Sequence, residues 1–252
     1  MRLIFLFVLF SVIFAFEEWK YEVPIEVREI SGRNLTEYQL RITVDVGKLI
    51  LDGKLKPDCE DIRIRDGMGN ELPYWVKNCG TPQTEIWFKI EELEGNSTSL
   101  LYLYYGNAEA QSKSNGSAVF DIFEDFSSPN IETRWEIIGN WQINTQERYA
   151  EGCGNNDVLW PSLYSKSNIT SWCVVEADVN NVDYGNGIFL LDLLNNRLGG
   201  VAGYIDTSEG SLVYLWNSTT RKTFGSLSCR SGWCHWTLKF SPTEVEFKEG
   251  KK

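Results

Sequence analysis

The sequence predicts an all-β protein made of two antiparallel β-sandwich domains of jelly-roll type in tandem. Three observations lead to this fold class. Short runs alternate apolar with polar residues along the whole chain, as strands with one buried face do. Gly-Asn, Asp-Gly and Ser-Gly pairs separate these runs, as turns do. A helical spacing of apolar residues is missing, apart from one turn expected at Val46–Leu51.

The first sixteen residues have the features of a secretory signal peptide. Arg2 is positive, residues 3–14 are almost wholly apolar, and Ala15 is a small residue before the acidic start of the mature chain. The apolar run is shorter than the roughly 20 residues that a membrane-spanning helix needs. We therefore expect cleavage near Ala15 or Phe16, export, and no membrane span in the mature chain.

Residues 17–120 form the first predicted domain. Its strands alternate apolar and polar residues, except for the nearly continuous apolar run Leu100–Tyr105, which is typical of a sandwich core. The expected strands are Tyr21–Val27, Leu40–Val46, Ile62–Ile64, Ile86–Ile90 and Leu100–Tyr105. The small, polar residues Ala108–Ala118 predict a linker, or a short helix that leads into one.

Residues 121–252 form the second predicted domain, which is richer in Trp and Asn. Its expected strands are Trp135–Ile138, Trp141–Ile143, Cys173–Val179, Ile188–Leu194, Val201–Ile205, Leu212–Trp216, Trp236–Phe240 and Val245–Phe247. The last strand has no returning partner in the sequence. Either the chain is a fragment truncated at its C-terminus, or the final sheet has an open edge, which is an aggregation liability.

Charge and cysteine content limit the class of protein. The formal net charge of −11 disfavours nucleic acid and anionic lipid as partners. Six cysteines in an exported chain favour disulfides, and they allow 15 pairings. Pairing nearest neighbours keeps each bridge within one predicted domain and gives Cys59–Cys79, Cys153–Cys173 and Cys229–Cys234. A zinc site at Cys229–His235 is disfavoured, because it lacks a second ligand pair.

Several motifs carry a family resemblance. Those of the first half are Trp19-Lys-Tyr21, Ser31-Gly32, Leu35-Thr36, Tyr38-Gln39, Asp58-Cys59 through Ile62-Arg63, Leu72-Pro-Tyr-Trp75, Cys79, Ile86-Trp87 and Leu101–Asn107. In this order they resemble the domain of unknown function 2341 family of bacterial and archaeal surface proteins. The second half is similar to concanavalin-A/laminin-G-like modules, through Phe123–Ser127, Trp135, Gly139–Trp141, Val174–Val179 and Trp236–Leu238. The resemblance implies an extracellular, multi-domain surface protein, in which sugar-binding modules often accompany this domain. It implies no defined catalytic residues.

The residues bear on two kinds of catalysis. Glu176-Ala-Asp178 has the carboxylate spacing of some jelly-roll glycosidases, but Asn181 stands where a third carboxylate is needed. We expect both acids on the wet face of a half-buried strand. His235 is the single histidine, and no nucleophile elbow accompanies it. We therefore predict that the protein is not an enzyme. A carbohydrate-active hydrolase is the third alternative, after a binding protein and a structural module.

Ten tryptophans and eleven tyrosines suggest ligand contacts. Aromatic faces stack on sugar rings, and the aromatic residues in or beside predicted loops are the candidates: Trp160, Tyr184, Trp216 and Trp233. Those within predicted strands are expected to fill cores: Trp75, Trp87, Trp135 and Trp141.

Calcium is the only cofactor that the residues suggest. Oxygen ligands on neighbouring loops suit Ca²⁺, and the candidates are Glu124, Asp125, Asp183 and Asp192, with Asn186 beside them; solvated surface acids are the alternative. Five glycosylation sequons fall at turns or loops: Asn34, Asn96, Asn115, Asn168 and Asn217.

The sequence thus predicts a non-enzymatic binding or adhesion protein, secreted or on the cell surface, with an extracellular glycan or a surface protein as its partner. The alternative is a structural envelope or filament module without a small ligand.

Overall fold

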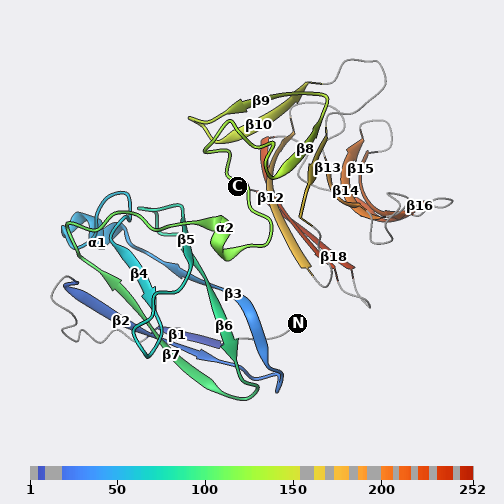
Figure 1. Ribbon diagram of the computed structural model, residues 1–252. Helices are drawn as coiled ribbons and strands as arrows, with labels where there is room; N and C mark the ends of the chain where they lie inside the picture. Colours follow the sequence, from blue (N-terminus) through green and yellow to red (C-terminus); the bar gives the residue numbers. More distant parts are fainter. Residues whose placement is uncertain are drawn as a thin grey trace. The chain divides into compact units, whose positions relative to one another are not determined.

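The computed structural model describes residues 5–8, 19–153, 162–167, 173–181, 187–191, 200–206, 210–216, 221–226, 232–240 and 245–251 (Figure 1). The chain divides into two compact units, Met1–Ser167 and Asn168–Lys252. The described residues are mostly strands in antiparallel sheets, which confirms the predicted all-β class. Among them, no helix has the length and apolar character to cross a membrane.

The first unit contains two sheets. One has the order β1–β2–β7–β4 and consists of Phe5–Val8, Tyr21–Arg28, Thr98–Tyr105 and Ile62–Arg65. The other has the order β3–β6–β5 and consists of Leu35–Val44, Thr84–Leu93 and Tyr74–Lys77. The expected helical turn is the short helix α1 (Gly47–Leu51).

Alternation along the strands places the core between these two sheets. In β6 every second residue from Thr84 to Ile90 is buried, while Glu85, Trp87 and Lys89 face away. The core cluster joins apolar side chains of both sheets: Val23, Ile25, Val27, Ile62, Ile64, Leu101 and Leu103 from the first, and Leu40, Ile42, Tyr74, Ile86, Phe88 and Ile90 from the second. The period of two in the sequence therefore determines which residues enter the core.

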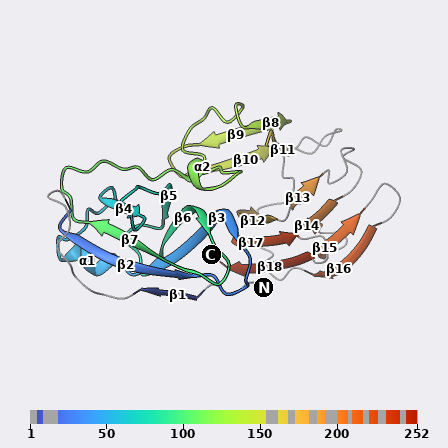
Figure 2. The same ribbon diagram turned by 60° about the horizontal axis from the view of Figure 1, so that its bottom comes forward.

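Part of the predicted signal peptide forms strand β1. It pairs antiparallel with β2, from Phe5 opposite Arg28 to Val8 opposite Ile25 (Figure 2). The pairing stops before Pro24, which has no backbone N–H to contribute to a ladder. Cleavage of the leader stays a prediction, and removal of residues 5–8 would leave β2 at the edge of its sheet.

The segment predicted as a linker packs on the first unit. We call residues 107–119 the strap; it ends in the one-turn helix α2 (Gly116–Val119). The amide of Asn115 donates to the Tyr74 carbonyl at 2.8 Å, and the amide of Val76 donates to Ser114 Oγ at 2.9 Å. Because β5 is an edge strand, these bonds satisfy polar backbone groups that the sheet leaves open.

Four further strands follow the strap within the first unit. Trp135–Ile138 (β8) pairs with Ser162–Ser165 (β11), and Asn140–Asn144 (β9) pairs with Tyr149–Cys153 (β10). The structure thus divides at Ser167, whereas the sequence placed the boundary at residue 120. Aromatic packing across residue 120, described below, accounts for the difference.

The second unit contains two antiparallel sheets. Cys173–Asn181 (β12), Gly232–Phe240 (β17) and Val245–Lys251 (β18) form one, with β17 in the middle. Gly187–Leu191 (β13), Gly200–Asp206 (β14), Gly210–Trp216 (β15) and Arg221–Ser226 (β16) form the other. The last strand pairs with β17 from Phe240–Val245 to Cys234–Lys251. Its other side is an edge among the described strands.

Candidate functional site

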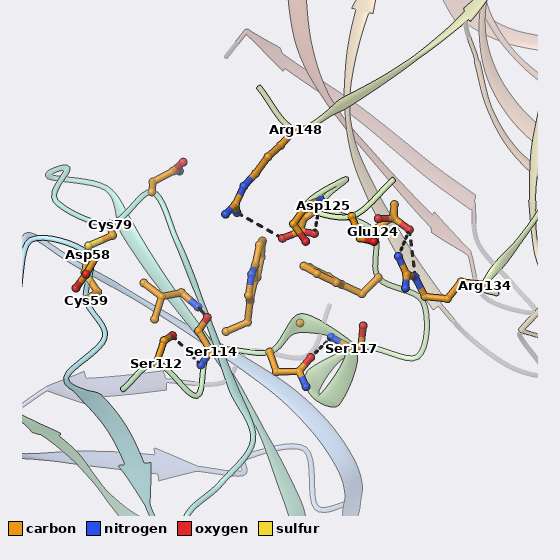
Figure 3. A pocket seen from close by; sticks show the side chains of 18 residues that line it. Asp58, Cys59, Cys79, Ser112, Ser114, Ser117, Glu124, Asp125, Arg134 and Arg148 are labelled. Carbon is orange, nitrogen blue, oxygen red and sulfur yellow. Dashed lines mark hydrogen bonds and ion pairs between the residues drawn. A yellow bond between two sulfur atoms is a disulfide. The ribbon is translucent and has the colours of Figure 1, made fainter. Parts of the chain in front are cut away.

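A cleft of about 560 Å³ opens on the first unit, beside the edge strand β5 (Figure 3). Three segments supply its walls. The disulfide loop contributes Asp58, Cys59, Asn78 and Cys79; the strap contributes Ser112, Ser114, Asn115, Gly116 and Ser117; the segment after the strap contributes Phe123, Glu124, Asp125, Ser127, Ser128, Arg134 and Arg148. Residues far apart in sequence therefore meet at this place.

Aromatic rings form one side of the cleft. Trp75 faces away from the sandwich core, and its ring centroid lies 4.8 Å from that of Phe123 and 5.9 Å from that of Phe120. Phe120 also meets Trp87 at 5.1 Å. The sequence had placed Trp75 and Trp87 in the core; both are instead half-buried on the outer face of their sheet. The prediction for these two rings is wrong, because each occupies the polar position of an alternating strand.

Glu124 is committed to a network of donors. Its Oε2 accepts from Arg134 Nη2 at 2.8 Å, from Arg134 Nε at 3.2 Å and from the Trp135 indole at 2.9 Å. Its Oε1 accepts from the amide of Phe126 at 2.9 Å. The Glu124 side chain is only 6% exposed, so this two-pronged pair with Arg134 offsets the desolvation of its carboxylate.

Asp125 and Arg148 form a looser pair at the mouth. Arg148 Nη1 lies 3.4 Å from Asp125 Oδ2, and the arginine side chain is 63% exposed. Figure 3 shows Arg148 extending toward Asp125 across the cleft. An exposed pair at this distance contributes little stability, so both groups can exchange their contact for a ligand.

The predicted calcium ligands are only partly described. Asp183 and Asp192 lie outside the described residues, as does Asn186. Glu124 and Asp125 are engaged by arginines, as above. Within the described ranges, no group of three or more His, Cys, Asp or Glu side chains converges as metal ligands do. Calcium stays a prediction that would depend on the undescribed loops.

Residues 58–144 match the sequence profile of a domain of unknown function, DUF2341. The match supports the family resemblance for this part of the chain. It begins at Asp58, later than the motifs suggested, and continues past the strap to Asn144. All cleft residues except Arg148 lie inside the DUF2341 segment. No curated protein and no solved structure gives a significant match; the concanavalin-A/laminin-G-like resemblance of the second half stays a prediction.

A second polar surface lies on the sheet of β12, β17 and β18. Cys234, Trp236 and Leu238 are buried on one face of β17. Trp233, His235 and Thr237 therefore point to the opposite face, where Trp233 is 41% exposed. His235 Nδ1 lies 2.8 Å from Asp178 Oδ1, and its Nε2 lies 3.8 Å from Glu176 Oε2. The sequence placed the two acids on a wet face, as found, but did not bring His235 to them.

The other three aromatic ligand candidates are Trp160, Tyr184 and Trp216. Trp160 and Tyr184 lie outside the described residues, and of Trp216 only its position in β15 is described. Trp233 is thus the single predicted ligand residue whose exposure is established.

One predicted disulfide is confirmed, and one is absent. Cys59 and Cys79 are bonded, with their Cα atoms 6.0 Å apart. Cys234 is also disulfide-bonded, while its predicted partner Cys229 lies outside the described residues. Cys173 carries a free thiol, so the structure does not contain the Cys153–Cys173 bridge. That pair would join two compact units, because Cys153 ends β10 and Cys173 begins β12.

Three of the five sequon asparagines are described, and all three are exposed. Asn34 Oδ1 accepts from the Gly95 amide at 3.0 Å, and Asn115 Oδ1 accepts from the Ser117 amide at 3.0 Å. Asn96 lies in a turn with φ of 57°. Asn168 and Asn217 lie outside the described residues. Use of these sites stays a prediction.

Proposed function

We propose that this protein is a secreted or cell-surface binding and adhesion protein that recognises glycans without acting on them chemically. The cleft is the observation that supports this most. It places the half-buried rings of Trp75 and Phe123 among amide, hydroxyl and guanidinium groups. A pyranose ring has matching surfaces, since an apolar face lies beside a rim of hydroxyls.

The polar groups of the cleft suit hydroxyl recognition. Asn78, Ser112 and Ser117 are exposed at its walls. Asp125 can accept from a hydroxyl, and Arg148 can donate to one, because their mutual contact at 3.4 Å is weak and exposed. Charged and neutral hydrogen-bonding groups thus lie around the aromatic side of the cleft.

The cleft offers poor support for hydrolysis. A glycosidase needs a carboxylic acid that gives its proton to the leaving group. Glu124 instead accepts four N–H groups through its two oxygens, so both oxygens are already occupied by donors of the protein. A purely structural envelope or filament module remains the alternative, and it predicts no saccharide binding at all.

The test is a glycan array with the exported chain, followed by calorimetry on each ligand found. Arg148→Ala should weaken binding about tenfold, as the loss of a charged hydrogen bond does. Arg28→Ala is the matched control, because Arg28 is also an exposed arginine of the first unit with a single carboxylate partner, Glu26, at 2.9 Å. Its affinity should equal that of the wild type.

Two outcomes would contradict the proposal. If no glycan on the array binds, a purely structural module would explain the protein better than a glycan-binding one. Array ligands that all bind Arg148→Ala as tightly as the wild type would show that the cleft is not a glycan site.

A further inference from the structure

The outer face of strands β12 and β17 carries a second, chemically different arrangement of side chains. Register places Asn180 opposite Trp233, Asp178 opposite His235, and Glu176 opposite Thr237. Residues directly opposite in an antiparallel pair share a face. The exposed ring of Trp233 therefore lies on the same face as an imidazole, two carboxylates and an amide.

The contacts of His235 assign the roles of its two nitrogens. Asp178 Oδ1 is 2.8 Å from Nδ1, and an ionised carboxylate only accepts. Nδ1 therefore carries the hydrogen of this bond, and Nε2 takes no part in it. Glu176 Oε2, also an acceptor, lies 3.8 Å from Nε2, too far for a hydrogen bond between them.

We propose that this face binds uncharged polysaccharide through a vicinal diol. Two neighbouring hydroxyls of one sugar ring can each form a hydrogen bond, one with His235 Nε2 and the other with Glu176 Oε2 as acceptor. Trp233 lies two residues from His235 along β17, about 7 Å away, where its ring can stack on the adjacent sugar. The proposal rests on glycan recognition as the protein's function, but it uses a different site from the cleft.

Charge on this face selects among polysaccharides. The register also places Lys239 opposite Glu246 and Thr237 opposite Lys248. Both lysines contact Glu246, at 3.6 Å and 2.8 Å. The face thus carries three acids and two lysines besides His235. A polyuronate would therefore be repelled by Glu176 and Asp178, whereas neutral sugar hydroxyls would find acceptors.

Calorimetry on the exported chain tests this with dextran and a neutral mannan, which carry free vicinal hydroxyls. The matched probe is the same polysaccharide after periodate oxidation and borohydride reduction, which opens the rings at their diols. We expect at least one untreated polysaccharide to bind, no binding of its treated form, and no binding of a polyuronate. Glu176→Gln and His235→Gln should each weaken binding about tenfold.

Val174→Thr is the control variant, because Val174 lies on the same face of β12 and is 57% exposed; its affinity should not change. The indole N–H signal that disappears in Trp233→Ala should shift when the polysaccharide is added. Failure of both polysaccharides to bind, or equal binding of the oxidised form, would overturn the inference. Arg148→Ala should leave this binding intact, so failure here and failure of the cleft are distinguishable.

Discussion

Single carboxylates hold together the loops at the ends of the first sandwich. Glu29 follows β2 and is buried. It accepts from the amides of Ser31 and Gly32 at 2.8 Å, from the amide of Asn96 at 3.0 Å, and from the Ser31 hydroxyl. One side chain thereby joins the corner after β2 to the turn between β6 and β7.

These donors make stability depend on pH. The Ser31 hydroxyl, with the amides of Asn96, Ser31 and Gly32, lowers the pKa of Glu29 from 4.5 to about 2 against the opposing effect of burial. A depressed folded pKa stabilises the fold above the unfolded pKa, and that contribution disappears as the pH falls from about 4.5 to 2. Glu29→Gln should lower the urea midpoint at pH 6 and flatten its decline in acid. Glu26→Gln, in the preceding strand β2, should keep the wild-type slope; parallel curves for all three proteins would refute the assignment.

Beside the cleft, Arg134 donates two of the hydrogen bonds that the Glu124 carboxylate accepts. Arg134→Met would leave the buried Glu124 carboxylate with two of its four donors, so we expect a loss of about 1–3 kcal/mol in the free energy of unfolding. Arg148→Ala removes an exposed contact at 3.4 Å and should cost less than about 0.5 kcal/mol. Equal losses in chemical denaturation would mean that Glu124 does not depend on Arg134.

At the scale of elements, the strap and the aromatic cluster depend on a glycine. A Cβ on Gly116 of α2 would lie 2.2–2.5 Å from three ring atoms of Phe123. Because a ring cannot yield as the end of a flexible chain can, Gly116→Ala should displace Phe123 from Trp75. We expect a loss of about 1–3 kcal/mol and a changed near-ultraviolet circular dichroism spectrum. Gly67→Ala, where the added carbon comes no closer than 3.4 Å, should preserve that spectrum.

The disulfide ties two loops that form a wall of the cleft. Cys59 and Cys79 are separated by 20 residues in sequence, and closing such a loop is worth about 3 kcal/mol. The double variant Cys59→Ala/Cys79→Ala should lose that amount in urea unfolding. Cys173→Ala, which removes a thiol without a bridge, should lose much less. Peptide mapping without reduction should recover Cys59 linked to Cys79; a link from Cys59 to any other cysteine would contradict this.

For the whole molecule, the segment after the strap decides where the first unit can be cut. A chain of residues 19–120 keeps both sheets except for β1, but loses Phe123, Glu124 and the strands after them. We expect it to expose Trp75 and Trp87 and to bind a hydrophobic dye, whereas residues 19–167 should fold with dispersed amide signals. Equal melting temperatures for the two pieces would show that the segment after residue 120 adds nothing.

Much of the fold was predictable because the strand period of two is a local property. Tyr21–Val27 and Ile86–Ile90 bury the residues that alternation indicates, and the helical turn at 46–51 and the Cys59–Cys79 bridge follow from local pattern and spacing. The site was less predictable. Trp75 and Trp87 obey the same alternation, but their apolar character suggested the core, and only the packing of Phe120 and Phe123 explains their outward position.

The sequence by itself determined the all-β class, the inward face of most strands of the first unit and one disulfide, since each depends on residues close together in the chain. Only the tertiary structure decided that a linker-like segment packs along β5, that Glu124 pairs with Arg134, and that His235 lies between Asp178 and Glu176. Those pairs are joined by strand register and by contacts across long stretches of chain. Such contacts form only when the whole chain has folded, so no local sequence pattern predicts them.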